Sequence, residues 1–251
     1  MSAKQTALIM GMPITVEIVD APDAETAIQD TFDYFRSVDD KYSTYKKVSE
    51  ITRINEGLPK TKWSQEMREV LALCEQTRQQ TNGYFNIEHN GKLDPSGLVK
   101  GWAIEQAAKR LRERKIEDFY IEAGGDIQVE GLNTAGELWK IGIENPFNRH
   151  EIVKVLRVSG LGVATSGTYI RGQHIYDPHS PDQTVTAVKS LTVIGPNIYE
   201  ADRFATAAFA MGLKGIEFIE SLPNFEGYMI HSNKTATYTS GFERFVATAH
   251  V

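Results

Sequence analysis

The stretch FYIEAGGDIQV, from Phe119 to Val129, lies in the middle of the chain and decides which class of fold it adopts. Aromatic and β-branched residues alternate with polar residues on both sides of Gly124 and Gly125, and this period of two predicts a strand. Glycines inside a strand weaken it, so this pair predicts a bulge or a close approach of the backbone to a ligand or to another strand. The pair lacks the third glycine and the following helix of a dinucleotide-binding fingerprint.

Helices predominate before this stretch, and strands predominate after it. Apolar residues at helical spacing predict helices over 24–38, from an N-cap at Ser64 to about Asn82, from Gly97 to Leu111, and over 200–211. Alternating residues predict strands in the second half of 6–19 and at 138–143, 152–158, 162–170, 188–194, 227–231, 236–239 and 242–246. Because the elements do not alternate as regular βαβ units, the pattern favours an α+β fold. No linker or repeat divides the chain, so we expect a single domain over 1–251.

Composition excludes several classes of function. The 251 residues are 41% hydrophobic and 24% charged, which is ordinary for a soluble globular protein. A net charge of -6 argues against sequence-independent binding of nucleic acid. Residues 1–5 lack the apolar region of a signal peptide, and no window approaches about 18 apolar residues, so we expect a cytoplasmic protein without a membrane span. The one cysteine, Cys74, has the spacing of a buried helical residue.

The segment from Leu93 to Trp102 is the first candidate for chemistry. A turn with Pro95 and Gly97 leads directly into a helix, whose free N–H groups and dipole suit a phosphate. Lys100 could add a positive charge toward the same anion. The alternative is a helix capped by Asp94 or Ser96, with Lys100 in solvent.

Two further candidates lie in the second half of the chain. A lone histidine before a turn, such as His174, is usually a structural hydrogen-bonding residue, but the nearby Thr165, Ser166 and Asp177 make a proton-transfer role more plausible. They do not form a Ser-His-Asp triad, because no G-x-S-x-G nucleophile elbow is present. Asp202 and Thr206 are four positions apart in a helical pattern and therefore share a face, where they could ligate a hard cation such as Mg²⁺. Alternatively, Asp202 is an acidic residue stabilised by the dipole in the first turn of its helix.

The candidate motifs also follow one another in a defined order. They are Met10-Gly11, Ser43-Thr44-Tyr45, Gly83-Tyr84-Phe85, Leu93-Asp94 to Lys100-Gly101, Gly124-Gly125-Asp126, Ala164-Thr165-Ser166-Gly167, His174-Ile175 to Asp177-Pro178, and Ala201-Asp202 to Thr206. In this order the chain resembles the FAD:protein FMN transferase family, also called the ApbE family, from about residue 9 to residue 213.

This resemblance implies a fold, a reaction and a set of site residues. The fold would be a T-fold-like α+β domain of mixed, mainly antiparallel sheets with packed helices. The reaction would be Mg²⁺-dependent cleavage of FAD, transfer of FMN to a threonine of an acceptor flavoprotein, and release of AMP. His174 would be the catalytic base, and the Gly97 carbonyl, Asp202 and Thr206 would hold the metal. The FAD site would be lined by Met10, Tyr45, Tyr84, Phe85, Asn86, Asp94, Lys100 and Ile175.

The chain departs from the family pattern at three places. Met12 follows Gly11 where a threonine is usual, Asn86 replaces an aspartate, and a long covering segment is reduced to Ile87–Lys92. Two alternatives stay open. One is a pyrophosphatase that hydrolyses FAD to FMN and AMP at the same site; the other, motivated by Asn86 and the shortened segment, is a protein that binds FAD without catalysis. The protein could be a monomer or a homodimer.

Overall fold

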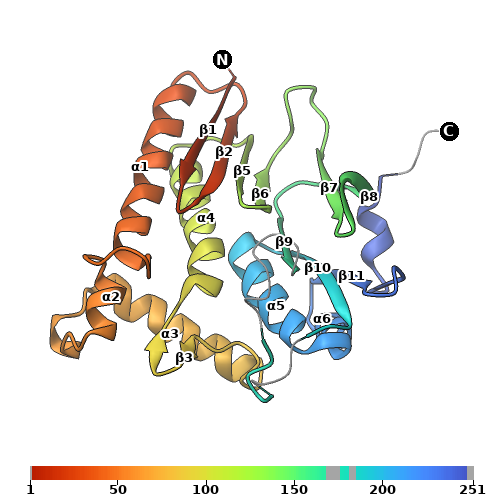
Figure 1. Cartoon of the computed structure of the whole chain (residues 1–251). Coiled ribbons are helices and arrows are strands. Elements are labelled where there is room, and N and C mark those ends of the chain that lie inside the picture. Colours follow the sequence, from red (N-terminus) through yellow and green to blue (C-terminus); the bar gives the residue numbers. More distant parts are fainter. Residues whose placement is uncertain (1, 168–175, 181–184, 248–251) are drawn as a thin grey trace.

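One antiparallel sheet of eight strands organises the molecule. The computed structural model describes residues 2–167, 176–180 and 185–247 (Figure 1). In space the strands follow the order β1-β2-β5-β6-β9-β10-β11-β12, and each neighbouring pair is antiparallel. Their bounds are β1 Ala3–Ile9, β2 Met12–Ile18, β5 Phe119–Ala123, β6 Asp126–Glu130, β9 Gly162–Gly167, β10 Val188–Gly195, β11 Glu226–His231 and β12 Ala236–Tyr238. This confirms the predicted mixed, mainly antiparallel α+β class.

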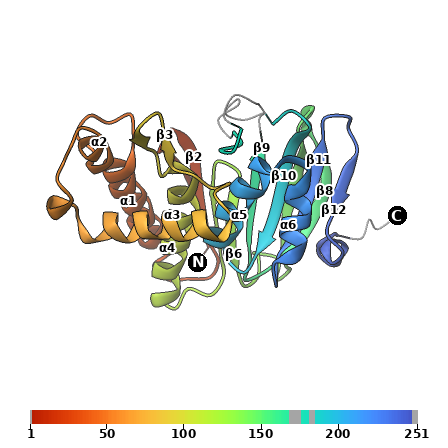
Figure 2. The same ribbon diagram turned by 90° about the horizontal axis from the view of Figure 1, so that it is seen from below.

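Helices and a separate hairpin complete the described structure. The helices are α1 Ala24–Tyr42, α2 Glu50–Asn55, α3 Gln65–Gln80, α4 Ser96–Glu113, α5 Ile198–Ala210 and α6 Gly215–Ser221, with 3-10 turns Lys60–Lys62, Gly212–Lys214 and Phe242–Phe245. Two small sheets are the hairpins β3 Glu88–His89 with β4 Lys92–Leu93, and β7 Trp139–Asn145 with β8 Asn148–Val158. Figures 1 and 2 show α1 to α4 gathered toward the β1 end of the sheet, and α5 and α6 beside β9 to β11.

Two hydrophobic cores form because side chains alternate between the faces of the sheet. The larger core joins Leu191 and Val193 of β10 to the helices, including buried Ile104 of α4 and Phe209 of α5. The second core lies under the β7–β8 hairpin and includes Val129, Trp139, Leu156, Ile194, Tyr228 and Phe242. Cys74 is buried in the larger core, as predicted. Among the described residues, no helix combines the length and apolarity needed to cross a bilayer.

Two sequence predictions of strands are wrong. The stretch from Phe119 to Val129 is two strands joined by a turn, because both Gly124 (φ 59°) and Gly125 (φ 93°) adopt left-handed conformations that reverse the chain. The glycine pair therefore marks a hairpin and not a bulge. Residues 242–246 begin as a 3-10 turn, which inserts the fully buried Phe242 into the second core.

The antiparallel register brings several turns to one end of the sheet. Gly124, in the turn between β5 and β6, donates its N–H to the Pro13 carbonyl at the start of β2. Thr165, toward the end of β9, donates its N–H to the Asp126 carboxylate at the start of β6 (3.2 Å). The β1–β2 turn, with Met10 at φ 56°, therefore lies at the same end of the sheet as Asp126.

Candidate functional site

Two glycines of α4 allow close contact with the functional face of α5. A Cβ on Gly101 would lie 2.6 Å from the Cβ of Asp202, closer than real side chains approach. A Cβ on Gly97, one turn earlier, would lie 3.6 Å from the methyl group of Thr206 and 3.5 Å from the ring of Phe85. The antiparallel crossing of the two helices thus brings the three predicted metal ligands, Gly97, Asp202 and Thr206, to one place.

The carboxylate of Asp202 is nearly enclosed, with 3% of the residue exposed. Its Oδ2 accepts the backbone N–H of Gly101 (2.9 Å), and its Oδ1 lies 3.7 Å from the Lys100 ammonium. Burial, followed by the nearby Asp126 carboxylate, holds the pKa of Asp202 well above its ordinary value. The acidic residue in the first turn of α5 is Glu200, so the alternative first-turn role of Asp202 is wrong.

Asp126 is a carboxylate of this site to which no role was predicted from the sequence. It is fully buried at the start of β6, and its Oδ2 lies 2.5 Å from the Lys100 ammonium. The backbone N–H of Thr165 holds its other oxygen. The sequence feature that points to Asp126 is its place directly before the buried strand residues of β6. The position of Lys100 opposite Asp126 depends on packing between α4 and the sheet.

Lys100 therefore faces carboxylates and not solvent, since only 17% of its side chain is exposed.

The carboxylate cluster formed by Asp126, Asp202 and Lys100 fits a hard divalent cation. Two buried carboxylates, Asp126 and Asp202, lie beside a single ammonium, so the cluster carries an excess negative charge when both carboxylates are ionised. In the described part of the chain, no three His, Cys, Asp or Glu side chains converge on one point. A cation here would accordingly use the Thr206 hydroxyl and the Gly97 carbonyl beside Asp202, which are oxygen donors of the kind that Mg²⁺ prefers.

The loop after α3 contributes a support and two local turns. Phe85 is buried beside Gly97, and its N–H is bound by the Thr81 hydroxyl (3.1 Å). The side-chain oxygen of Asn86 accepts the N–H of Glu88 (2.9 Å), a turn that either an asparagine or an aspartate can form. Asp94 Oδ1 accepts the N–H of Ser96 (3.0 Å) and fixes the start of α4. The N-cap of α4 is Pro95, which makes no side-chain capping bond, and Lys100 is not in solvent, so the alternative of a helix capped by Asp94 or Ser96 is wrong.

The shortened segment between the two motifs forms the β3–β4 hairpin. Asn90 (φ 52°) and Gly91 (φ 71°) make the two-residue turn. Asn55, at the end of α2, fastens this hairpin by donating to the Leu93 carbonyl (2.9 Å) and accepting from its N–H (2.8 Å). No sequence pattern indicates this contact, which joins positions 38 residues apart.

Residues 176–180 lie against this loop region at two points. The Tyr176 hydroxyl donates to the Glu88 carbonyl (3.4 Å). His179 Nε2 is 2.9 Å from the Asn82 carbonyl, and its ring meets the edge of Tyr84 at 4.6 Å between centroids. His179 is not among the site residues predicted from the sequence. The predicted base His174 and the predicted FAD contact Ile175 lie outside the described residues.

Two predicted FAD contacts are not joined to the carboxylate cluster. Met10 is partly buried in the β1–β2 turn, and Tyr45 is 96% exposed between α1 and α2. Among the described residues, no hydrogen bond or ion pair connects either side chain to Asp126, Lys100 or Asp202.

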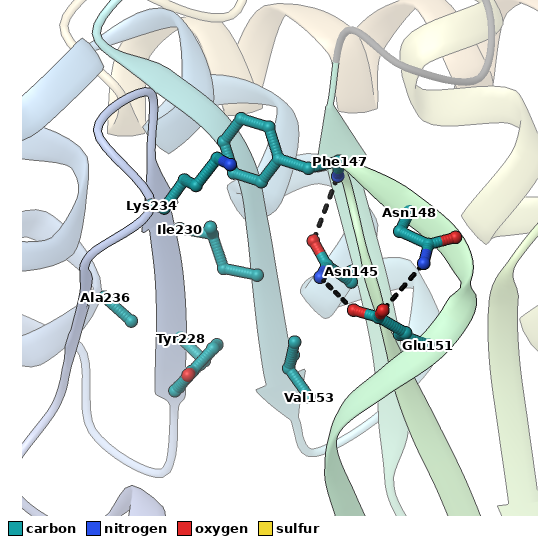
Figure 3. Close-up of a pocket in the computed structure, with 9 residues that line it drawn as sticks. All are labelled: Asn145, Phe147, Asn148, Glu151, Val153, Tyr228, Ile230, Lys234 and Ala236. Atoms are coloured by element: carbon teal, nitrogen blue, oxygen red, sulfur yellow. Dashed lines mark hydrogen bonds between the residues drawn. The ribbon is translucent and has the colours of Figure 1, made fainter.

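A groove of about 310 Å³ lies apart from these residues, between the β7–β8 hairpin and the β11–β12 strands (Figure 3). Glu151 in its wall accepts the side-chain amides of Asn145 (2.8 Å) and Asn148 (2.7 Å). The Lys234 ammonium lies 5.6 Å from the centroid of the Phe147 ring. None of the predicted site residues is among those that line this groove.

Comparisons with known proteins agree with the family resemblance. The model of the ApbE family matches residues 10–90 and 87–229. The FAD:protein FMN transferase of Vibrio cholerae is 33% identical over 129 residues, which are 48% of this chain and 39% of the relative. That of Haemophilus influenzae is 30% identical over 149 residues, 55% of this chain and 43% of the relative. The chain thus spans about two fifths of the length of these relatives.

Solved structures show the same fold over nearly the whole chain. The flavin transferase ApbE of Vibrio cholerae aligns with a TM-score of 0.86 and 23% identity, covering 98% of this chain and 99% of that one. The ApbE protein of Thermotoga maritima aligns with a TM-score of 0.87 and 18% identity, covering 98% and 100%. At these identities the likeness establishes the architecture.

Proposed function

Because this chain belongs to the ApbE family, we propose that it cleaves FAD and transfers FMN to a threonine hydroxyl of an acceptor flavoprotein, with release of AMP. The observation that carries the proposal is the α4–α5 crossing, which places Asp202 and Thr206 against Gly101 and Gly97 in a buried, negatively charged cluster. The reaction is a phosphoryl-type transfer, for which positioning and charge neutralisation supply most of the catalysis.

We assign the roles in this reaction as follows. His174 takes the proton from the threonine hydroxyl, whose oxygen then attacks the phosphorus of the FMN half. A P–O bond forms to the threonine, the P–O bond to AMP breaks, and AMP leaves with the bridging oxygen. Asp202, Thr206 and the Gly97 carbonyl hold Mg²⁺, which when bound supplies positive charge to the pyrophosphate oxygens.

The remaining predicted residues would bind FAD. Exposed Tyr45 and partly buried Tyr84 offer aromatic surfaces for the flavin or the adenine ring, together with Met10, Asn86, Asp94, Lys100 and Ile175. Phe85 has 2% of its surface exposed, so its contribution to the FAD site would be to pack against Gly97.

The test is co-expression with a threonine-bearing acceptor flavoprotein, followed by intact-mass and peptide mass spectrometry. We expect an added FMN on the acceptor threonine, and we expect Asp202→Asn to abolish it. Glu117→Gln, an acid-to-amide change at an exposed position, is the matched control and should retain transfer. Release of AMP with equal speed in the absence of acceptor would favour the pyrophosphatase instead. Bound FAD that stays intact in both assays would favour a non-catalytic flavin-binding protein.

A further inference from the structure

We propose that Asp126 is a positioning residue: it holds the Lys100 ammonium away from Asp202 and so leaves the Asp202 carboxylate available to the divalent cation. This inference rests on the proposed function, because it concerns how the same site receives its metal. Asp126 would act through Lys100 and not as a ligand.

The distances in the cluster carry the argument. The Lys100 ammonium is 2.5 Å from Asp126 but 3.7 Å from Asp202, so the direct ion pair is with Asp126. Asp126 is itself held by the N–H of Thr165 (3.2 Å), and the Thr165 hydroxyl is bonded to that of Thr192 (2.8 Å) across β9 and β10. The ammonium is therefore anchored to the sheet, while Asp202 belongs to a helix.

Burial makes this choice of partner consequential. Because little of Lys100 is exposed, water replaces a lost carboxylate partner poorly, which favours closer pairing of the ammonium with another carboxylate in reach. Asp202, 3.7 Å away, is such a carboxylate when Asp126 is uncharged. Lys100 would then compete with the divalent cation for Asp202.

A double-mutant cycle separates this role from a simple contribution of negative charge. The affinity for Mg²⁺ alone is measured by titration calorimetry on the full chain without FAD, for wild type, Asp126→Asn, Lys100→Met and the double variant. We expect Asp126→Asn to weaken Mg²⁺ binding about tenfold or more. We expect Lys100→Met to raise the affinity much more in the Asp126→Asn background than in the wild type, because only there does Lys100 occupy Asp202.

Equal effects of Lys100→Met in both backgrounds would overturn the inference, as would unchanged Mg²⁺ affinity in Asp126→Asn. Asp126→Ser is prepared in parallel, since serine adds no bulk to the buried position, and circular dichroism checks that each variant folds. Asp126→Glu, which keeps the charge, should retain most of the affinity, and a loss as large as that of the asparagine variant would also contradict the proposal. Transfer of FMN by the wild type is measured separately, so failure of the proposed function and failure of this inference are distinguishable.

Discussion

At the scale of single residues, the site depends on how closely α4 and α5 approach. We predict that Gly101→Ala destabilises the protein by about 1–3 kcal/mol, the usual cost of overpacking, and abolishes FMN transfer. The added Cβ would meet the Asp202 Cβ at 2.6 Å and the backbone carbonyl of Ile198 at 2.9 Å, and a backbone atom cannot move aside cheaply. Urea unfolding measures the loss.

Gly97→Ala is the matched control for this prediction. Its new Cβ would make ordinary contacts of 3.5 Å with Phe85 and 3.6 Å with Thr206. Because alanine also favours a helix over glycine by up to about 1 kcal/mol, this variant should be as stable as the wild type or more stable. Equal destabilisation by the two substitutions would show that close packing at Gly101 is not the cause.

The charge of Asp202 gives a second residue-scale prediction. Its pKa is raised in the folded state. Above the ordinary aspartate pKa of about 4, the folded protein therefore binds more protons than the unfolded chain. Stability of the metal-free protein should therefore fall as the pH rises from about 4 toward the raised pKa. Asp202→Asn should lose this slope, unfold at an equal or higher temperature near neutral pH, and no longer gain stability from Mg²⁺. Thermal unfolding with EDTA or Mg²⁺ across this pH range measures both effects. A steeper slope in the variant would refute the assignment.

At the scale of elements, Arg203 joins α5 to the end of α3. Only 5% of the residue is exposed, and its guanidinium contacts Glu200 (2.5 Å), Gln80 (2.5 Å) and Thr77 (3.2 Å). We predict that Arg203→Met costs roughly 2–3 kcal/mol, somewhat less than a fully buried pair because Glu200 is partly exposed. Denaturant unfolding measures the change.

Arg78→Met is the control for this contact. Arg78 pairs with Glu75 on the exposed face of α3, where about half of each side chain is accessible, and such exposed pairs contribute little to stability. A similar loss in the two variants would mean that burial of Arg203 is unimportant. Arg203→Lys should recover only part of the stability, since an ammonium cannot reproduce the planar contacts.

The long helices and most strands of the large sheet could be predicted from sequence, whereas several short elements could not. Ser64 accepts the N–H of Met67 (3.2 Å) at the start of α3, as its position before a helical pattern indicated. Strand β1 and helices α2 and α6 were not predicted, because β1 mixes small and polar residues and the two helices are too short for a clear apolar period. Sequence spacing placed Asp202 and Thr206 on one face. It could not reveal the pairing of Lys100 with Asp126, which depends on how α4 packs against the sheet.

At the scale of the whole molecule, the sheet links two cores on its opposite faces. The single-domain prediction for 1–251 requires that these cores unfold together, since they share strands such as β10. Trp102 lies in the larger core and Trp139 in the second, so each provides a fluorescence probe when the other tryptophans are replaced by phenylalanine.

Phe242→Ala tests this cooperativity from the face that lacks the predicted site. The ring is fully buried and stacks on Tyr228 with centroids 5.1 Å apart, so its removal should cost about 3–5 kcal/mol. If the sheet transmits this loss, the unfolding transitions reported by Trp102 and Trp139 shift together, while Mg²⁺ affinity of the folded protein stays unchanged because Phe242 belongs to the second core. A shift of the Trp139 transition alone would divide the chain into two separately unfolding units and contradict the single-domain prediction.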